Sequence, residues 1–200
     1  MNAPLFVPFR FRRGAALIAA AVCVAAAGIA PAGAADAPAP RDPAAADGQH
    51  DFDFFFGQWD GLQHRLKQRL HHSTEWDDFQ SHIVARPLLG GRANTDEVVF
   101  RNGTSSGGAT FRLYDPEKKQ WSIYWIGTTS YALDPPVVGH FVGDTAEFYG
   151  DDVWEGKKVK VRFIWKKGDL THCHWEQAFS EDGGKTWETN WSVEWVRTAF

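Results

Sequence analysis

From His50 to the end of the chain, short runs of alternating apolar and polar residues are separated by turn residues, roughly every eight to twelve positions. Because side chains of a β-strand point to opposite faces in turn, this rhythm indicates antiparallel β-structure. The only helical feature expected is a turn at "DFDFFF". Ten strands joined by short links predict an all-β fold, a single antiparallel up-and-down β-barrel. The strands are expected at residues 57–66, 75–85, 95–101, 108–114, 119–126, 137–142, 145–150, 158–166, 171–180 and 186–196.

The first 35 residues have the pattern of a cleaved signal peptide. Arg10, Arg12 and Arg13 precede the apolar run "GAALIAAAVCVAAAGIA", and the small residues at 32–34 form a cleavage site. The alternative is an uncleaved membrane anchor, because the run approaches the length that spans a bilayer. The signal peptide predicts a periplasmic or secreted bacterial protein without a stable membrane anchor, exported by either the Sec or the Tat route.

Residues 36–49 are rich in Ala, Pro and Asp and predict a disordered linker, which leaves residues 50–200 as the barrel domain. After removal of the signal peptide, Cys173 is the only cysteine, so no internal disulfide is expected. The net charge of -4 is mild and there is no basic stripe, which argues against nucleic acid as a partner. The pattern makes no prediction about the oligomeric state.

The segment "SEDGGKTW" resembles the Asp-box of sialidases and other β-propellers. A propeller repeats its motif from blade to blade, whereas this chain contains the motif once. We therefore interpret it as a structural hairpin turn, in which Asp182 accepts backbone N–H bonds and Trp187 packs beneath the turn.

The two ends of the domain resemble a lipocalin. The sequence Gly57-Gln58-Trp59 begins the first strand, and Arg197 lies late in the last one. In lipocalins such an arginine lies over the tryptophan, a cation–π contact that closes one end of the barrel. The resemblance implies a calycin-like barrel in which Gly57 and Arg197 are structural residues.

The region from about residue 51 to 197 also resembles a bacterial family known only as a domain of unknown function. This resemblance implies a lipocalin-like barrel and no established activity. It is carried by "DFDFFFGQWD", "RPLLGG", "FRLYDPEKKQWSIYW", "VRFIW" and "WEQAFSEDGGKTWETNW".

The direction of each strand face decides which side chains could meet a ligand. In the last strand Trp187, Trp191, Trp195 and Arg197 share one face, and the polar residues at 188, 190, 192 and 194 share the other. We favour the interpretation that the tryptophan faces form the core. The interior is then aromatic, and Arg65 and Gln177 are the polar groups within it.

The alternative places the other face inside, where it would form a charged, hydrogen-bonding pocket. Its members would be Arg112, Tyr124, Arg162, Glu176 and Asn190. Burying such charges is costly and would suggest function. Taken over both interpretations, the candidate ligand-binding residues are Trp59, Arg65, Arg112, Tyr124, Trp125, Arg162, Glu176, Gln177 and Asn190.

A few histidines could bind a metal or haem, but we expect neither a metal nor another cofactor. His172, His174 and Glu176 stand in a row on one strand, whereas a tetrahedral site usually draws its ligands from more than one element. His82 and His140 are the candidates for haem ligation.

Three functions stay open. The leading hypothesis is an exported barrel that binds a small apolar or amphipathic organic molecule in an aromatic pocket. The second is a small-barrel enzyme of the isomerase, cyclase or hydrolase type, with acid-base chemistry at an Arg/Glu/Tyr cluster. The third is a module without a pocket that binds another protein or the envelope. Since no nucleophile elbow, P-loop or dinucleotide fingerprint is present, no catalytic residue is assigned.

Overall fold

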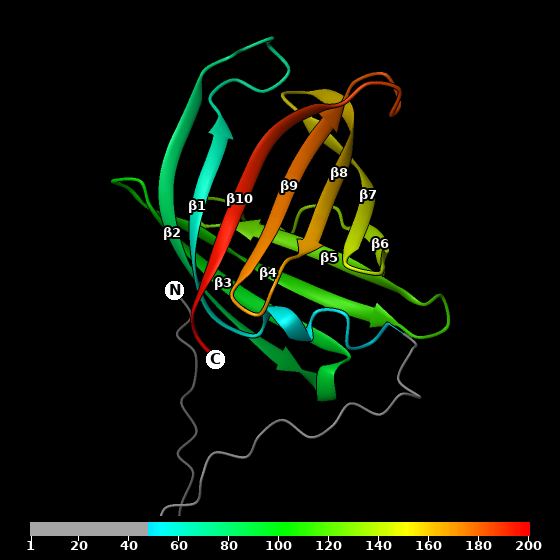
Figure 1. Ribbon diagram of the computed structural model, residues 1–200. Coiled ribbons are helices and arrows are strands. Elements are labelled where there is room, and N and C mark those ends of the chain that lie inside the picture. Colours follow the sequence, from blue (N-terminus) through cyan, green and yellow to red (C-terminus); the bar gives the residue numbers. More distant parts are fainter. Residues whose placement is uncertain (1–47) are drawn as a thin grey trace, which may run out of the picture. The chain divides into compact units, whose positions relative to one another are not determined.

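The structure is a computed structural model that describes residues 48–200, so the expected signal peptide and most of the expected linker lie outside the described residues. Ten antiparallel strands form one closed up-and-down barrel, as the sequence predicts (Figure 1). Each strand pairs with its neighbours in sequence, and the first pairs with the last. The strands are β1 (Gly57–Leu66), β2 (Trp76–Leu88), β3 (Ala93–Arg101), β4 (Ser105–Asp115), β5 (Gln120–Gly127), β6 (Val137–Val142), β7 (Thr145–Trp154), β8 (Lys157–Lys167), β9 (His172–Ser180) and β10 (Glu188–Ala199), and the short 3-10 helices are η1 (Asp53–Phe55) and η2 (Leu89–Gly91).

The largest difference from the expected strand limits is in β7. Gly150, Asp151 and Asp152 suggest a turn by their intrinsic preferences, but β7 continues through them to Trp154. The reason is the neighbouring strand, because Asp151 pairs with Lys160 and Asp152 with Val159 in a continuous ladder. Strand pairing thus outweighs local propensity here.

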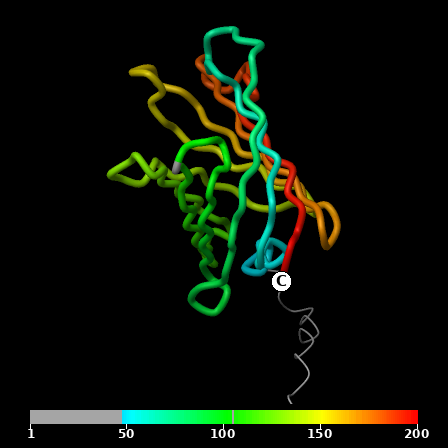
Figure 2. Tube along the Cα trace, turned by 90° about the vertical axis from the view of Figure 1, so that its left-hand side faces the viewer, coloured from blue at the N-terminus to red at the C-terminus, as the bar shows by residue number. Residues whose placement is uncertain are grey.

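One end of the barrel is closed by aromatic side chains, and we call it the closed end. The η1 turn lies across this end, beside the start of β1 and the end of β10 (Figures 1 and 2). Phe52 packs edge-on against Trp121 and Trp165, and Phe55 stacks on Trp59 with ring centroids 5.4 Å apart. We call Phe52, Phe55 and Trp59 the aromatic plug. Burial of each aromatic side chain removes roughly 150–250 Å² of its surface from water, so the plug is a major part of the core.

Arg197 of β10 holds this plug against the strands of the barrel. Its guanidinium lies 4.0 Å from the centroid of the Trp59 ring, the contact that the lipocalin resemblance implies. Its nitrogens donate to the carbonyl oxygens of Phe54, Phe56 and Leu170. Gly57 has a φ of 112°, and a Cβ there would lie 2.5 Å from the Ala199 carbonyl oxygen. Only glycine fits this closure of first strand on last.

The segment with the Asp-box pattern forms the turn between β9 and β10. Asp182 Oδ1 accepts the backbone N–H groups of Lys185 and Thr186 at 2.9 Å, and its Oδ2 accepts the Thr186 hydroxyl at 2.7 Å. A Cβ placed on Gly184 would lie 3.3 Å from the Trp187 ring, so this ring lies against the turn. These contacts are those expected of a structural hairpin turn.

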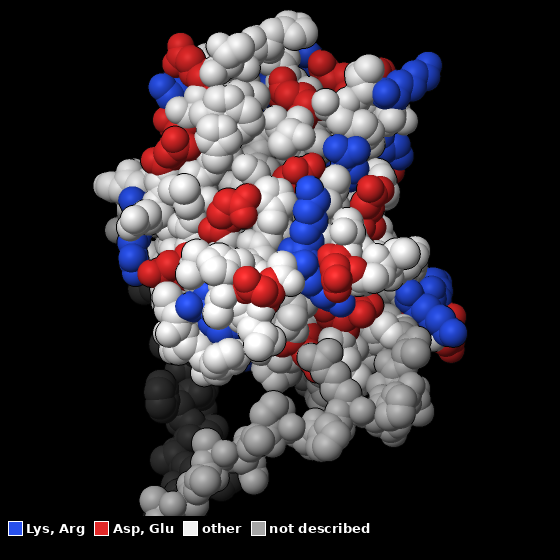
Figure 3. Space-filling view, in the orientation of Figure 1, with Lys and Arg blue, Asp and Glu red and all other residues white. Residues whose placement is uncertain are grey.

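The opposite end of the barrel, the open end, carries the loops at 67–75, 102–104, 128–136, 155–156 and 181–187. On the face of the molecule in Figure 3, basic and acidic side chains are interspersed, without a patch of one sign. Within residues 48–200, no helix has the length and apolar character needed to cross a bilayer.

Candidate functional site

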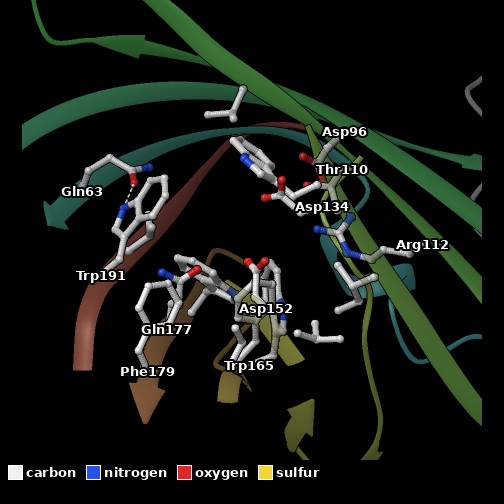
Figure 4. Close-up of a pocket in the computed structure, with 18 of the residues that line it drawn as sticks. Gln63, Asp96, Thr110, Arg112, Asp134, Asp152, Trp165, Gln177, Phe179 and Trp191 are labelled. Carbon is white, nitrogen blue, oxygen red and sulfur yellow. Dashed lines mark hydrogen bonds and ion pairs between the residues drawn. The ribbon is translucent and has the colours of Figure 1, made fainter. Parts of the chain in front are cut away.

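A cavity of about 250 Å³ occupies the barrel between the aromatic plug and the open end. Inward-facing residues of most of the strands line it, because the tryptophan-bearing faces point into the barrel. Both ends of the cavity carry polar groups: we call the deep group, Asp96, Arg112, Trp165 and Trp195, the floor, and the group at the open end, Arg69, Asp134, Asp152 and Trp154, the mouth. Figure 4 shows Asp96, Thr110 and Arg112 on one side of the cavity, and Gln63 with Trp191 on the other.

Trp191 of β10 lies at the centre of a group of aromatic rings beside the cavity, which we call the aromatic wall. Its ring makes edge contacts with Phe100, Trp175 and Trp125, with centroids 5.8, 5.6 and 6.5 Å apart. Trp125 in turn lies over Gly108 of β4, where a Cβ would collide with the indole. The aromatic wall therefore consists of four rings, those of Trp191, Phe100, Trp175 and Trp125, which pack edge to face and come from four different strands.

A chain of hydrogen bonds fixes the orientation of the Trp191 ring. The indole Nε1 donates to Gln63 Oε1 at 2.7 Å, and Gln63 Nε2 donates to the Ser81 hydroxyl at 2.8 Å. Gln63 and Ser81 are fully buried, so these hydrogen bonds form away from water, where hydrogen bonds are stronger. The ring is thus held in place before any ligand arrives.

A buried ion pair forms the floor. Arg112 Nη1 donates to Asp96 Oδ2 at 2.5 Å and to Asn94 Oδ1 at 3.0 Å, and the arginine is only 3 % exposed. The guanidinium also lies over Phe52 and Trp165, 5.0 and 5.4 Å from their ring centroids. Charges in such surroundings must compensate each other, so the Asp96–Arg112 pair contributes no net charge to the floor.

Several buried polar atoms of the floor have no hydrogen-bond partner among residues 48–200. They are Asp96 Oδ1, Arg112 Nε, Trp165 Nε1 and Trp195 Nε1. Leaving such a group unpaired costs about 1–3 kcal/mol, which is why folded proteins rarely do so. They belong to residues that line the cavity, so the missing hydrogen bonds are concentrated at its floor.

At the mouth, charges of opposite sign come from different segments of the chain. Arg69 lies over the rings of Trp154, Trp191 and Phe179, at 4.8, 5.4 and 5.6 Å. Burial, and secondarily the nearby Arg65, lower the pKa of Arg69 to about 10, against a smaller opposing effect of Glu188. Asp134 lies in the 128–136 loop between β5 and β6. Burial, and secondarily the charge of Asp152 on β7, raise the pKa of Asp134.

Four of the nine candidate binding residues contact the cavity or its rim, and a fifth lies directly behind them. Arg112, Trp125 and Gln177 line it. Arg65 lies at the rim, 5.4 Å from the Trp191 ring centroid. Asn190 is buried directly behind the wall, where its Oδ1 accepts a bond from Gln177 Nε2 at 2.8 Å.

The other four candidates lie elsewhere. Trp59 is buried in the plug at the closed end, with its Nε1 bonded to the Phe55 carbonyl. Tyr124, Arg162 and Glu176 are on the outer faces of β5, β8 and β9, because their sequence neighbours point inward. The charged face proposed as an alternative lining is therefore divided, and Arg112 meets Asp96 instead of Glu176.

The expectation that Trp187 shares a face with Trp191 is wrong. A register shift between Thr189 and Trp191 interrupts the alternation in β10. As a result Asn190 is fully buried, and Trp187 lies outside the barrel against Tyr149 and Arg162. A β-bulge of this kind leaves no clear trace in the polar–apolar pattern.

Sequence reasoning missed several residues of the cavity. Gln63 and Asp96 could have been found, since Gln63 shares the strand face of Trp59, and Asp96 that of Val98 and Phe100. Arg69 and Asp134 lie in loops, where alternation carries no information, and they could not have been found in this way.

The candidate histidines His82, His140, His172 and His174 do not line the cavity, and three of them lie beside carboxylates. His174 Nδ1 lies 2.6 Å from Glu194, His172 lies 3.1 Å from Asp169, and His82 lies 2.7 Å from Asp60. Within residues 48–200, no three His, Cys, Asp or Glu side chains are grouped so as to hold a metal ion.

In comparison with known proteins, no family model and no curated protein matches this chain. The closed barrel of ten antiparallel strands is consistent with a calycin-like fold. The resemblance to a particular bacterial family stays a prediction.

Proposed function

We propose that this protein is an exported barrel that binds a small amphipathic organic molecule in its aromatic cavity. The observation that carries the proposal is the combination of a preformed cavity with a floor of buried, unpartnered polar atoms. An apolar cavity with a few converging polar groups is the usual form of a small-molecule site.

The volume of the cavity limits the size of the ligand. A cavity of about 150 Å³ in another protein holds one benzene molecule. The present cavity of about 250 Å³ is therefore suited to a ligand with about two fused rings, or an aliphatic group of similar size. The tryptophan rings around it favour a flat apolar body, because ring faces and edges can both contact it.

The floor favours a ligand whose inner end is polar and uncharged. A hydroxyl group is an example, since it can donate to Asp96 Oδ1 and accept from the Trp165 or Trp195 indole N–H. Such a group would restore the hydrogen bonds that these side chains lack. A second formal charge beside the compensated Asp96–Arg112 pair would instead be buried without a partner.

Export and family membership belong to the same proposal. They are supported by the basic, apolar and small-residue pattern of residues 1–35 and by the long stretches of family resemblance. Release of the processed protein by periplasmic extraction of a Gram-negative host would support export, and retention in the membrane fraction would contradict it.

Native mass spectrometry of protein from the full-length gene, followed by denaturing extraction, would reveal any molecule that copurifies. A quantitative test uses 2-naphthol, a bicyclic molecule with one hydroxyl group, in isothermal titration calorimetry. Saturable binding with one molecule per barrel is expected.

Two variants on adjacent positions of β3 make the test specific. Val98→Phe adds a ring inside the cavity, whereas Val99→Phe adds it on the exposed outer face. We expect the first change to reduce 2-naphthol binding by about tenfold or more and the second to leave it unchanged. Equal affinity in both variants would place the binding site outside the cavity.

A further inference from the structure

Arg65 and Arg69 differ from the other inward-directed arginines of the barrel in having no polar partner. Among residues 48–200, neither guanidinium forms a hydrogen bond or an ion pair with a carboxylate within 4.0 Å. By contrast, Arg112 is paired with Asp96, and Arg197 donates to three backbone carbonyls. The two rim arginines therefore keep most of their hydrogen-bonding capacity free.

The two guanidiniums are neighbours around one aromatic ring. Each lies 5.4 Å from the centroid of Trp191, and Arg65 also lies 4.8 Å from that of Phe79. Burial lowers the pKa of both, and the charge of Arg65 lowers that of Arg69 further. Asp77 and Glu188 compensate these charges only at longer range.

Two partly desolvated like charges with free donors are a favourable place for an anion. A carboxylate between them would relieve their repulsion and accept charge-assisted hydrogen bonds. The fixed Trp191 ring positions both arginines in advance, so little further ordering is required for binding.

We propose that Arg65 and Arg69 bind the carboxylate of an aromatic or other bulky organic acid, whose apolar body occupies the barrel cavity. This inference rests on the proposed function and assigns its ligand to a class, a monoanionic amphipathic acid.

The rest of the cavity sets the orientation of this acid. At the floor, the carboxylate of the ligand would lie close to the carboxylate of Asp96, and the two negative charges would repel each other. Across the mouth, Asp134 and Asp152 also disfavour an anion. The acid therefore enters with its uncharged end first, and its carboxylate stays at the arginine side of the mouth.

The test compares 2-naphthoate with 2-naphthamide, which have nearly the same shape and differ in charge. Calorimetric titrations are made at pH 7.5 on the full-length gene product, the double variant Arg65→Gln/Arg69→Gln, and the control Arg86→Gln. Arg86 is exposed on the outer face of β2, so its replacement removes one positive charge away from the cavity.

We expect the wild type and Arg86→Gln to bind 2-naphthoate about tenfold or more tightly than 2-naphthamide. In the double variant this preference should disappear while 2-naphthamide binding is retained, which also shows that the variant is folded. Equal affinity of the wild type for both compounds would overturn the assignment of an acid and leave the binding barrel standing. Failure of both compounds to bind would overturn the binding barrel and this inference together.

Discussion

At both the closed and the open end of the barrel, arginines lie over aromatic rings. The two ends differ in whether these arginines also form hydrogen bonds. At the closed end Arg197 lies over Trp59 and its nitrogens donate to three carbonyls. At the open end Arg69 lies over three rings and donates to no atom of residues 48–200. Since a satisfied polar group stabilises the fold and an unsatisfied one is available to a ligand, the comparison separates a structural end from the end at which we propose binding.

The largest expected difference between the two ends is the loss of stability when one tryptophan is removed from each. Trp59→Ala should lower the free energy of unfolding by about 3–5 kcal/mol, because it leaves a hole in a fully packed plug. Trp125→Ala enlarges an existing cavity, so a loss of only about 1–2 kcal/mol is expected, together with weaker 2-naphthol binding. Urea unfolding measures both, and equal losses would contradict the division into two ends.

A second test exchanges one arginine at each end. Arg197→Gln should cost about 2 kcal/mol, since the Phe54, Phe56 and Leu170 carbonyls lose a charged donor. Arg69→Gln should change stability by less than about 1 kcal/mol, because the cost of burying the charge offsets the cation–π contacts. A larger loss from Arg69→Gln than from Arg197→Gln would show that Arg69 is mainly a structural residue.

The turn between β9 and β10 is an exception at the open end, because its polar groups are satisfied. Backbone N–H groups and the Thr186 and Ser180 hydroxyls hold the pKa of Asp182 well below its usual range. A carboxylate with a lowered pKa contributes stability above its unfolded pKa of about 3.9 and loses it as the pH falls towards the folded pKa.

The stability difference between the wild type and Asp182→Asn should therefore be constant from pH 8 to about pH 5 and shrink below about pH 4. Thermal unfolding at several pH values measures it. The control is Glu181→Gln, whose carboxylate binds Lys157 at 3.0 Å instead of its own turn. A difference that grows in acid would show that the Asp182 carboxylate is not stabilised by these bonds.

The smallest effect concerns Cys173, which faces the interior near the closed end. Burial raises the pKa of its thiol to about 12, so very little thiolate is present at neutral pH. We expect no labelling by Ellman's reagent at pH 8 in the native protein and complete labelling in guanidinium chloride. Rapid labelling of the native protein would show that the closed end admits solvent.

The sequence predicts the barrel well and the site only in part, for reasons that differ between residues. Alternation places Trp121, Trp125 and Trp165 correctly, because it reports directly which face of a strand is buried. It fails at Trp187, where a bulge reverses the faces, and it gives no information about Arg69, which lies in a loop. The pairing of Arg112 with Asp96 depends on the register of β3 and β4, which no single strand reveals.

The meeting of first and last strands also fixes how the molecule can be handled. Gln58 pairs with Ala199, so the chain enters and leaves the barrel side by side at the closed end, as Figure 2 shows for the C-terminal side. A fusion partner, a surface tether or a dye attached after Phe200 would project from this end. The cavity mouth at the other end would then remain free, so the immobilised barrel could be used to measure the binding proposed above.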